Sequence, residues 1–243
     1  MHKLVIDFGN SRQKLAIYDG RRLVLKETFQ GIDEDKLGSW LFEKGPFSSI
    51  ILSSVANHSP EMEKLLSEAA PLIILDENTH LPIKNLYETP ATLGKDRLAA
   101  AVGAYALYPG RNVLSIDAGT CITYDFLTME GEYLGGGISP GIRMRFRAMN
   151  TFTGKLPLVE PEADFNALIG RNTNDSLLSG VINGAVEEIK GVVARYCEQY
   201  REVTVVITGG DLEFLHHKLK INIFAVPDLV LLGLNEILDS HDL

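Results

Sequence analysis

The chain has 243 residues, 45% of them hydrophobic, and a formal net charge of −9. This length is enough for one large domain or two modest ones with a substantial buried core. Nucleic acids and anionic membranes bind basic surfaces, so a chain this acidic is a poor candidate for either partner. Net charge does not exclude an anionic substrate, because such a substrate responds to the local charge of its site.

The two cysteines, Cys121 and Cys197, form neither a CxxC pair nor a Cys/His cluster with zinc spacing. A disulfide between them stays open, but so few cysteines in a chain of this length fit a reducing compartment. Residues 1–3 lead directly into a short apolar run that lacks the features of a signal peptide. No apolar run reaches the length of a membrane span. We therefore expect a soluble cytoplasmic protein.

The first half of the chain is predicted to contain five strands and one helix, followed by an alanine-rich helix. Ser59 and Pro60 are the N-cap and the first residue of the earlier helix, and Pro109-Gly110 ends the later one. Asp19-Gly20 is a hairpin signal. The predicted strands cover residues 4–6, 14–18, 21–29, 48–55 and 72–75, and the helices begin at residue 60 and span 94–107.

The second half of the chain repeats the same arrangement of a strand followed by an Asp-x-Gly turn. A strand over 113–116 ends at Asp117-Ala118-Gly119-Thr120, as the strand over 4–6 ends at Asp7-Phe8-Gly9-Asn10. We interpret this echo as two related α/β domains, 1–111 and 112–243, with a cleft between them. Further strands are predicted over 121–127, 132–134 and 203–207, and helices over 142–149, 175–200 and 228–238.

Each of the two turns has residues suited to phosphate binding. Glycine permits a tight turn, successive amides form an anion nest, and the strand-end carboxylate can hold a metal-bound water. One such turn is equally well an ordinary strand turn, but its recurrence at the matching place favours a pair that grips one polyphosphate. Cys121 beside the second turn is predicted to be a small apolar residue rather than a nucleophile.

Gly94-Lys95-Asp96-Arg97 begins the alanine-rich helix, where backbone N–H groups favour anions. Arg97 offers a planar fork for a carboxylate, and Asp96 offers an acceptor beside it. By themselves these residues are also explained by an ordinary helix start with a surface Asp–Arg pair.

Three further stretches keep two interpretations each. Residues 208–211 suit an adenine or ribose against the backbone, or a helix cap. The glycine-dense stretch 135–141 indicates close backbone approach or a flexible loop. Arg143, Arg145 and Arg147 meet phosphate or an acidic partner, or form a solvated face. The chain lacks both GxxxxGK[ST] and a strand-borne GxGxxG, which argues against a Walker loop and a Rossmann dinucleotide site.

In their order and spacing these motifs resemble those of type III pantothenate kinases, over nearly the whole chain. Ser11 stands where the family commonly has threonine, and Lys95 stands at a position that is often small or uncharged. Neither departure touches a proposed catalytic group. The motifs that carry the resemblance lie at residues 7–11, 85–90, 94–97, 117–120, 135–141 and 170–176.

The resemblance implies an α/β fold of two ribonuclease-H-like (actin-like ATPase) domains. It implies transfer of the γ-phosphoryl group of ATP to pantothenate, the first step of coenzyme A synthesis, with Asp96 as the catalytic proton acceptor. Asp117 would bind a monovalent cation, potassium or ammonium. The implied ATP-binding residues are Asp7, Phe8, Gly9, Asn10, Ser11, Arg12, Gln13, Lys14 and Thr120. The implied pantothenate-binding residues are Tyr87, Gly94, Lys95, Asp96, Arg97 and Thr173.

The resemblance further implies ATP with Mg²⁺ and a homodimer whose pantothenate pocket lies near the subunit interface. Two alternatives stay open. A kinase of the same fold acting on a different alcohol would keep the phosphate turns and change residues 94–97. A non-catalytic nucleotide-binding regulator would tolerate loss of Asp96.

Overall fold

The computed structural model describes residues 2–9, 12–54 and 58–241, which form an α/β protein with two compact units. Each unit has its own hydrophobic core. The predicted α/β class is confirmed. The first unit comprises residues 1–109, 130–134 and 228–243, and the second comprises 110–129 and 135–227.

These units divide the chain differently from the predicted halves 1–111 and 112–243. The C-terminal helix α7 (Leu229–Asp239) belongs to the first unit, because it packs against β1, β4 and α3 there. The strand β9 (Glu132–Pro140) begins in the first unit and continues in the second. The two ribonuclease-H-like domains with a boundary at residue 111 therefore stay a prediction, since the compact units interleave along the chain.

The first unit is built on a five-stranded mixed sheet in the order β3-β2-β1-β4-β5. The central strand β1 pairs antiparallel with β2 and parallel with β4. The strands are β1 His2–Phe8, β2 Gln13–Asp19, β3 Arg22–Phe29, β4 Phe47–Ser54 and β5 Leu72–Ile74. The helices are α1 Glu34–Lys44, α2 Pro60–Ala69, α3 Lys95–Leu107 and α7, with a short 3-10 turn at Pro90–Thr92.

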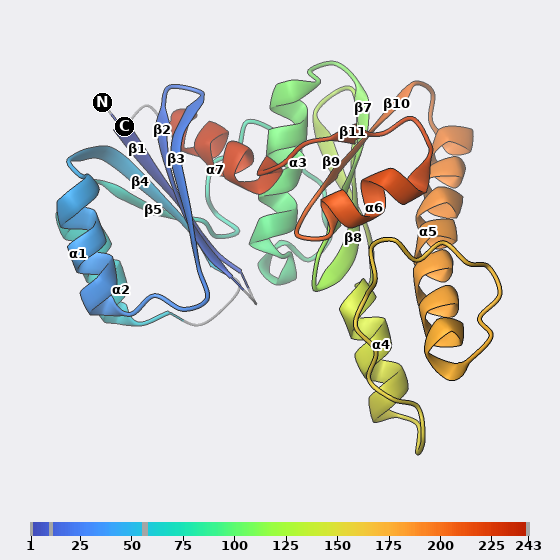
Figure 1. Cartoon of the computed structure of the whole chain (residues 1–243). Coiled ribbons are helices and arrows are strands. Elements are labelled where there is room, and N and C mark those ends of the chain that lie inside the picture. The colour runs from blue at the N-terminus through green and yellow to red at the C-terminus, as the bar shows by residue number, and fades with distance from the viewer. Residues whose placement is uncertain (1, 10–11, 55–57, 242–243) are drawn as a thin grey trace. The chain divides into compact units, whose positions relative to one another are not determined.

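The two faces of β1 have different roles. Alternate residues from Leu4 to Phe8 join the hydrophobic core to which α1 and α2 contribute. Both helices lie on one side of this sheet (Figure 1). Lys3, Val5 and Asp7 alternate with these core residues and face the opposite side of the sheet. There Lys3 pairs with Asp239 of α7. Asp7 shares this second face at the carboxyl end of β1, so its carboxylate lies outside the α1/α2 core.

The helix α1 is absent from the predicted elements. Asp33 is its N-cap and accepts a hydrogen bond from the Lys36 backbone N–H at 2.9 Å. Leu37, Trp40 and Leu41 are buried at helical spacing. Both signals are present in the sequence between the third and fourth strands, so this helix could have been predicted.

The helices α3 and α7 pack closely because the residues between them are small. A Cβ atom added at Gly103 would lie 2.5 Å from the Leu229 carbonyl oxygen. A Cβ atom at Gly233 would lie 1.7 Å from the Ala99 carbonyl oxygen. The alanine-rich character of α3 is therefore explained by its contact with α7.

The second unit contains a mixed sheet in the order β11-β10-β7-β8-β9. The strand β10 lies parallel to both β7 and β11, and β7 is antiparallel to β8. Its strands and helices are β7 Asn112–Ala118, β8 Cys121–Leu127, β10 Val203–Thr208, β11 Phe224–Ala225, α4 Ile142–Thr151, α5 Thr173–Gln199 and α6 Leu212–Leu219. Within the described ranges, no helix is both long and apolar enough to span a membrane.

The strand β9 extends further than predicted. The prediction ends a strand at residue 134 and leaves the following glycines as a close-approach segment or a loop, yet β9 continues to Pro140. The start of β9 pairs with the short strand β6 (Lys84–Asn85). A Cβ atom at Gly136 would lie 1.7 Å from the Tyr124 carbonyl oxygen, so glycine here lets β9 lie against β8. The loop interpretation is therefore wrong for this stretch.

We predict that Gly233→Ala lowers the free energy of unfolding by about 3 kcal/mol, because the new methyl group overlaps the α3 backbone and forces the helices apart. Urea denaturation followed by circular dichroism measures the change.

The matched control is Gly184→Ala in α5, where no atom lies within 4 Å of the position of the new Cβ. Alanine is the better helix former, so this variant should gain up to about 1 kcal/mol. Equal effects of the two substitutions would contradict the proposed helix contact.

Candidate active site

The carboxyl end of β1 carries the first candidate turn. The Gly9 N–H donates to the Arg12 carbonyl oxygen at 3.0 Å, and a Cβ atom at Gly9 would lie 3.1 Å from that oxygen. Asp7 is 5% exposed and lies opposite Lys14 of β2, whose Nζ is 3.5 Å from Asp7 Oδ2. The turn is therefore tight and places a buried carboxylate beside an ammonium group. The predicted ATP ligands Asn10 and Ser11 lie outside the described residues.

Two carboxylates interact at this point of the first unit. Burial raises the pKa of Asp7; the Lys14 ammonium opposes this rise, and the negative charge of Asp96 adds to it. One lysine therefore does not fully compensate the charge of this pair. A cation or a hydrogen-bond donor brought to the pair would be attracted to it.

The start of α3 presents Asp96. Gly94 is the N-cap and has no side chain, so the Asp96 Oδ1 atom accepts a hydrogen bond from the Arg97 backbone N–H at 2.8 Å. A Cβ atom at Gly94 would lie 2.6 Å from Asp96 Oδ1. Glycine is therefore needed before Asp96 to leave room for this carboxylate, which is half-buried.

Arg97 is a buried cation packed on an aromatic ring. It is 6% exposed, and its guanidinium carbon lies 5.7 Å from the centroid of the Tyr87 ring. The Tyr87 backbone N–H donates to Asn85 Oδ1 at 3.0 Å, and its ring lies 6.3 Å from that of Tyr133. The structure thus brings together Tyr87 and Arg97, two of the residues predicted to bind the same substrate.

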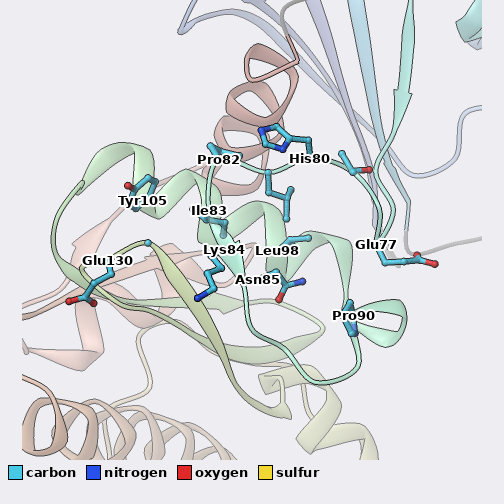
Figure 2. Close-up of a pocket in the computed structure, with 13 residues that line it drawn as sticks. Glu77, His80, Pro82, Ile83, Lys84, Asn85, Pro90, Leu98, Tyr105 and Glu130 are labelled. Atoms are coloured by element: carbon cyan, nitrogen blue, oxygen red, sulfur yellow. The ribbon is translucent and has the colours of Figure 1, made fainter.

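The Lys95 side chain pairs with Glu77, which is not among the predicted substrate-binding residues. Its Nζ lies 3.6 Å from Glu77 Oε2, so this departure from the family pattern forms an ion pair within the first unit. Glu77 also lines a hollow of about 700 Å³ beside α3 (Figure 2). Leu98 and Tyr105 line that hollow, and Leu98 lies about 200° around the helix from Asp96. The hollow is therefore on the other side of α3 from the catalytic candidate.

The second unit carries two turns side by side. Asp117 is the last residue but one of β7, Thr208 is the last residue of the neighbouring parallel strand β10, and the two residues are register partners. The Asp211 N–H donates to the Ala118 carbonyl oxygen at 2.8 Å. Gly209 has a φ of +99°, and a Cβ atom there would lie 2.4 Å from Asp117 Oδ1. Residues 117–120 and 208–211 therefore form one continuous surface of backbone groups.

The start of α4 packs on the same surface. The Gly141 N–H donates to the Thr120 carbonyl oxygen at 3.2 Å. A Cβ atom at Gly141 would lie 2.1 Å from the Gly119 carbonyl oxygen and 2.5 Å from that of Thr120. Of the arginines left open by the sequence, Arg143 bonds Asp211 Oδ1 at 3.0 Å. Asp211 occupies the N-cap position of α6, but its side chain makes no capping hydrogen bond.

The remaining predicted site residues differ in exposure: some are buried with structural partners and others are exposed. Phe8 is buried in the α1/α2 core, and Gln13 Oε1 accepts from the Ile32 N–H at 2.6 Å, so these side chains have structural partners. Arg12 is exposed. Thr173 is the first residue of α5 and is exposed, next to the N-cap Asn172.

The oxygen donors of these turns determine which metal ions they suit. In the described part of the chain, no group of three or more His, Cys, Asp or Glu side chains is arranged to hold a metal ion. Asp117 is half-buried, and its Oδ1 atom and the Ala118 carbonyl oxygen both lie beside Gly209. Carboxylate and carbonyl oxygens such as these suit a hard cation.

Known proteins match this chain over nearly its whole length. The family model described as type III pantothenate kinase matches residues 3–195. A relative named "Type III pantothenate kinase" from Christiangramia forsetii is 46% identical over 98% of both chains. A relative of the same name from Phocaeicola vulgatus is 44% identical, again over 98% of both.

Solved structures support the fold at lower identity. A conserved protein from Campylobacter jejuni has a TM-score of 0.63 at 23% identity and 98% coverage of both chains. A ROK hexokinase from Thermus thermophilus has a TM-score of 0.55 at 15% identity, covering 99% of this chain and 100% of its own. The likeness to sugar kinases confirms the predicted actin-like fold class.

We predict that Asp7→Asn stabilises the protein at neutral pH. Burial raises the Asp7 pKa above the ordinary value of 3.8, so wild-type stability falls as pH rises from about 3.8 to the raised pKa. The variant lacks this loss, so its advantage should grow over that interval and stay constant above it. Urea denaturation at a series of pH values measures the difference.

Asp33→Asn is the control. A hydrogen bond from the Lys36 backbone lowers the pKa of Asp33, so its charge favours folding above about pH 3.8. Asp33→Asn should therefore be less stable than the wild type at neutral pH, and this loss should shrink as the pH falls below about 3.8. An advantage of Asp7→Asn that does not change with pH would contradict the burial argument.

Proposed function

The chain belongs to the type III pantothenate kinase family, and on that premise we propose how its residues transfer the ATP γ-phosphoryl group to pantothenate. The chain is an ATP-dependent kinase, and its product, 4'-phosphopantothenate, opens coenzyme A synthesis. The observation that carries the residue assignment is the buried Asp7 carboxylate, which pairs with Lys14 and whose pKa is raised by burial and further by the charge of Asp96.

Asp96 is the proposed proton acceptor. Phosphoryl transfer has a loose transition state, so a carboxylate orients the attacking hydroxyl and takes its proton as the new bond forms. The hydrogen bond from the Arg97 N–H to Asp96 Oδ1 fixes the carboxylate at the helix start. Its second oxygen can then accept the proton of the pantothenate primary hydroxyl.

The pantothenate carboxylate is the proposed partner of Arg97. A guanidinium held against the Tyr87 ring loses little freedom when it binds a planar anion. Gly94 and Lys95 complete this part of the site, and the Lys95–Glu77 ion pair supports the helix start. Thr173 is proposed as a further pantothenate ligand on the family pattern.

ATP is proposed to bind at the turns of residues 7–14 and 117–120. The amides of the tight Gly9 turn and the Lys14 ammonium suit phosphate oxygens, and Thr120 is an exposed hydroxyl donor in the second turn. When bound, Mg²⁺ carried by ATP and a monovalent ion, potassium or ammonium, at Asp117 supply positive charge to the phosphates.

A homodimer is proposed for the assembled enzyme. Phe152, Leu168 and Ile169, which follow α4, are 85%, 80% and 76% exposed, an unusual exposure for large apolar side chains. A second copy of the chain would cover them. We also propose a cytoplasmic location; Cys121 and Cys197 are both free thiols, which fits a reducing compartment.

The function is tested by coupled ADP release with Mg-ATP, with and without pantothenate, in potassium and then in sodium buffer. We expect release that needs pantothenate and is faster in potassium. Release indifferent to pantothenate, or only with another alcohol, would contradict the substrate. Equal rates in both salts would contradict the ion at Asp117.

Asp96→Asn should lower kcat by about 10²–10⁴-fold and leave Mg-ATP affinity nearly unchanged. Asparagine keeps an oxygen acceptor for the Arg97 N–H, so the helix start is preserved while the base is lost. Steady-state kinetics and calorimetric titration of Mg-ATP measure the two quantities.

Asp33→Asn is the matched control, since it makes the same change at the exposed N-cap of α1, which has no proposed catalytic or binding role. Turnover of Asp96→Asn equal to that of this control would remove Asp96 from the mechanism.

A further inference from the structure

A hydrogen-bonded network joins four elements of the second unit. The guanidinium of Arg145 in α4 donates from Nε to the Pro140 carbonyl oxygen at 2.9 Å and from an Nη to Ser139 Oγ at 2.9 Å. The same Nη lies 2.6 Å from Glu188 Oε2 of α5. The hydroxyl of Tyr124 in β8 donates to Glu188 Oε1 at 3.0 Å. Glu188 thus links α5 to β8, and through Arg145 to β9 and α4.

The network is held in its charged form. Burial raises the pKa of Glu188, but hydrogen bonds from Arg145, Ser139 and Tyr124 outweigh it, and the net pKa lies below its usual value. Burial and the neighbouring Glu188 carboxylate raise the pKa of the Tyr124 hydroxyl, which keeps it a donor. The Arg145 and Glu188 side chains are 20% and 29% exposed, so solvent competes only partly for these bonds.

The segment that the network fixes is the one that packs on the second turn. Ser139 and Pro140, both bonded to Arg145, directly precede Gly141. Gly141 in turn contacts the carbonyl groups of Gly119 and Thr120 with no room for a side chain. A shift of residues 139–141 would therefore move the backbone at Thr120.

A separate ion pair holds the first turn of α4. Arg143 lies two residues before Arg145 and pairs with Asp211 in the neighbouring turn. The Asp211 N–H bonds the Ala118 carbonyl oxygen, within the second turn itself. Residues 117–120 are thus supported at Gly141, which follows the segment that the Glu188 network fixes, and independently through the Arg143–Asp211 pair.

We infer that Glu188 and Arg145 are positioning residues for ATP, which set the geometry of the 117–120 turn without touching the nucleotide. The inference rests on the proposed function in one respect, that this turn binds ATP. It predicts a specific kinetic result: weakening the network should impair ATP binding and change pantothenate binding little. Tyr87 and residues 94–97 belong to the first unit, and Thr173 lies at the start of α5, about 22 Å along the helix from Glu188.

The test compares two neighbouring glutamates on α5. Glu188→Gln keeps the side-chain shape and removes the charge that Arg145 and Tyr124 bond. Glu187→Gln removes an equal charge from an exposed pair with Lys190, one turn away on the same helix. We expect Glu188→Gln to raise the ATP KM and the calorimetric Mg-ATP Kd roughly tenfold, with the pantothenate KM changed less than about twofold. Glu187→Gln should change neither constant.

Arg145→Lys is the second variant, in case Glu188→Gln folds poorly. Lysine keeps the charge but cannot bond Pro140, Ser139 and Glu188 with a planar fork, so a smaller loss confined to ATP is expected. ATP constants equal to wild type in both variants would overturn the inference. A lower Tm together with equal increases in the ATP and pantothenate KM values would also overturn it. That result is expected if the network only stabilises the fold.

The experiment distinguishes failure of the positioning role from failure of the proposed function. An inactive wild type that still binds Mg-ATP leaves the Kd comparison intact and contradicts only the kinase assignment. A wild type that turns over pantothenate, with Glu188→Gln unchanged in its ATP constants, contradicts only the positioning role. A wild type without Mg-ATP binding contradicts both.

Discussion

The proposed site in the first unit depends on one electrostatic feature, the burial of the Asp7 carboxylate. The side-chain alternation of β1 places Asp7 on the sheet face opposite the α1/α2 core, and glycine at position 94 leaves space for Asp96 at the start of α3. Burial raises the pKa of Asp7; the Lys14 ammonium opposes the rise, and the charge of Asp96 adds to it. A carboxylate with a raised pKa lowers stability at neutral pH, and under the proposed function this loss falls where phosphoryl transfer needs charge stabilisation.

Much of this arrangement was predictable from local patterns. Alternation and turn residues predict the strands of both sheets except the two-residue strands β6 and β11. Ser59 accepts from the Met62 N–H as the predicted cap of α2. The order of short motifs predicts the family and the residues Asp96 and Asp117. The helix α1 was missed although Asp33 and the spacing of Leu37, Trp40 and Leu41 indicate it. The assignment of α7 to the first unit depends on long-range packing of Gly233 against Ala99, which no local pattern contains.

The second unit shows why glycine-dense sequence is ambiguous. A run such as 135–141 permits mobility or close packing, and only the neighbours decide. Here Gly136 lies against the Tyr124 backbone and Gly141 against the backbone of Thr120, so the run is an ordered strand and helix start. The supporting network of Arg145 and Glu188 was also invisible in sequence, because its members are 43 positions apart.

The most direct test of the account is the pKa of Asp7 itself. Carbon-13 NMR of labelled aspartate carboxyl groups would follow its titration in the wild type and in Asp96→Asn. The account predicts a lower Asp7 pKa in the variant, because the charge that raises it has been removed while burial and Lys14 are retained. An Asp7 pKa that is the same in both proteins would contradict the coupling of the two carboxylates on which the proposed site rests.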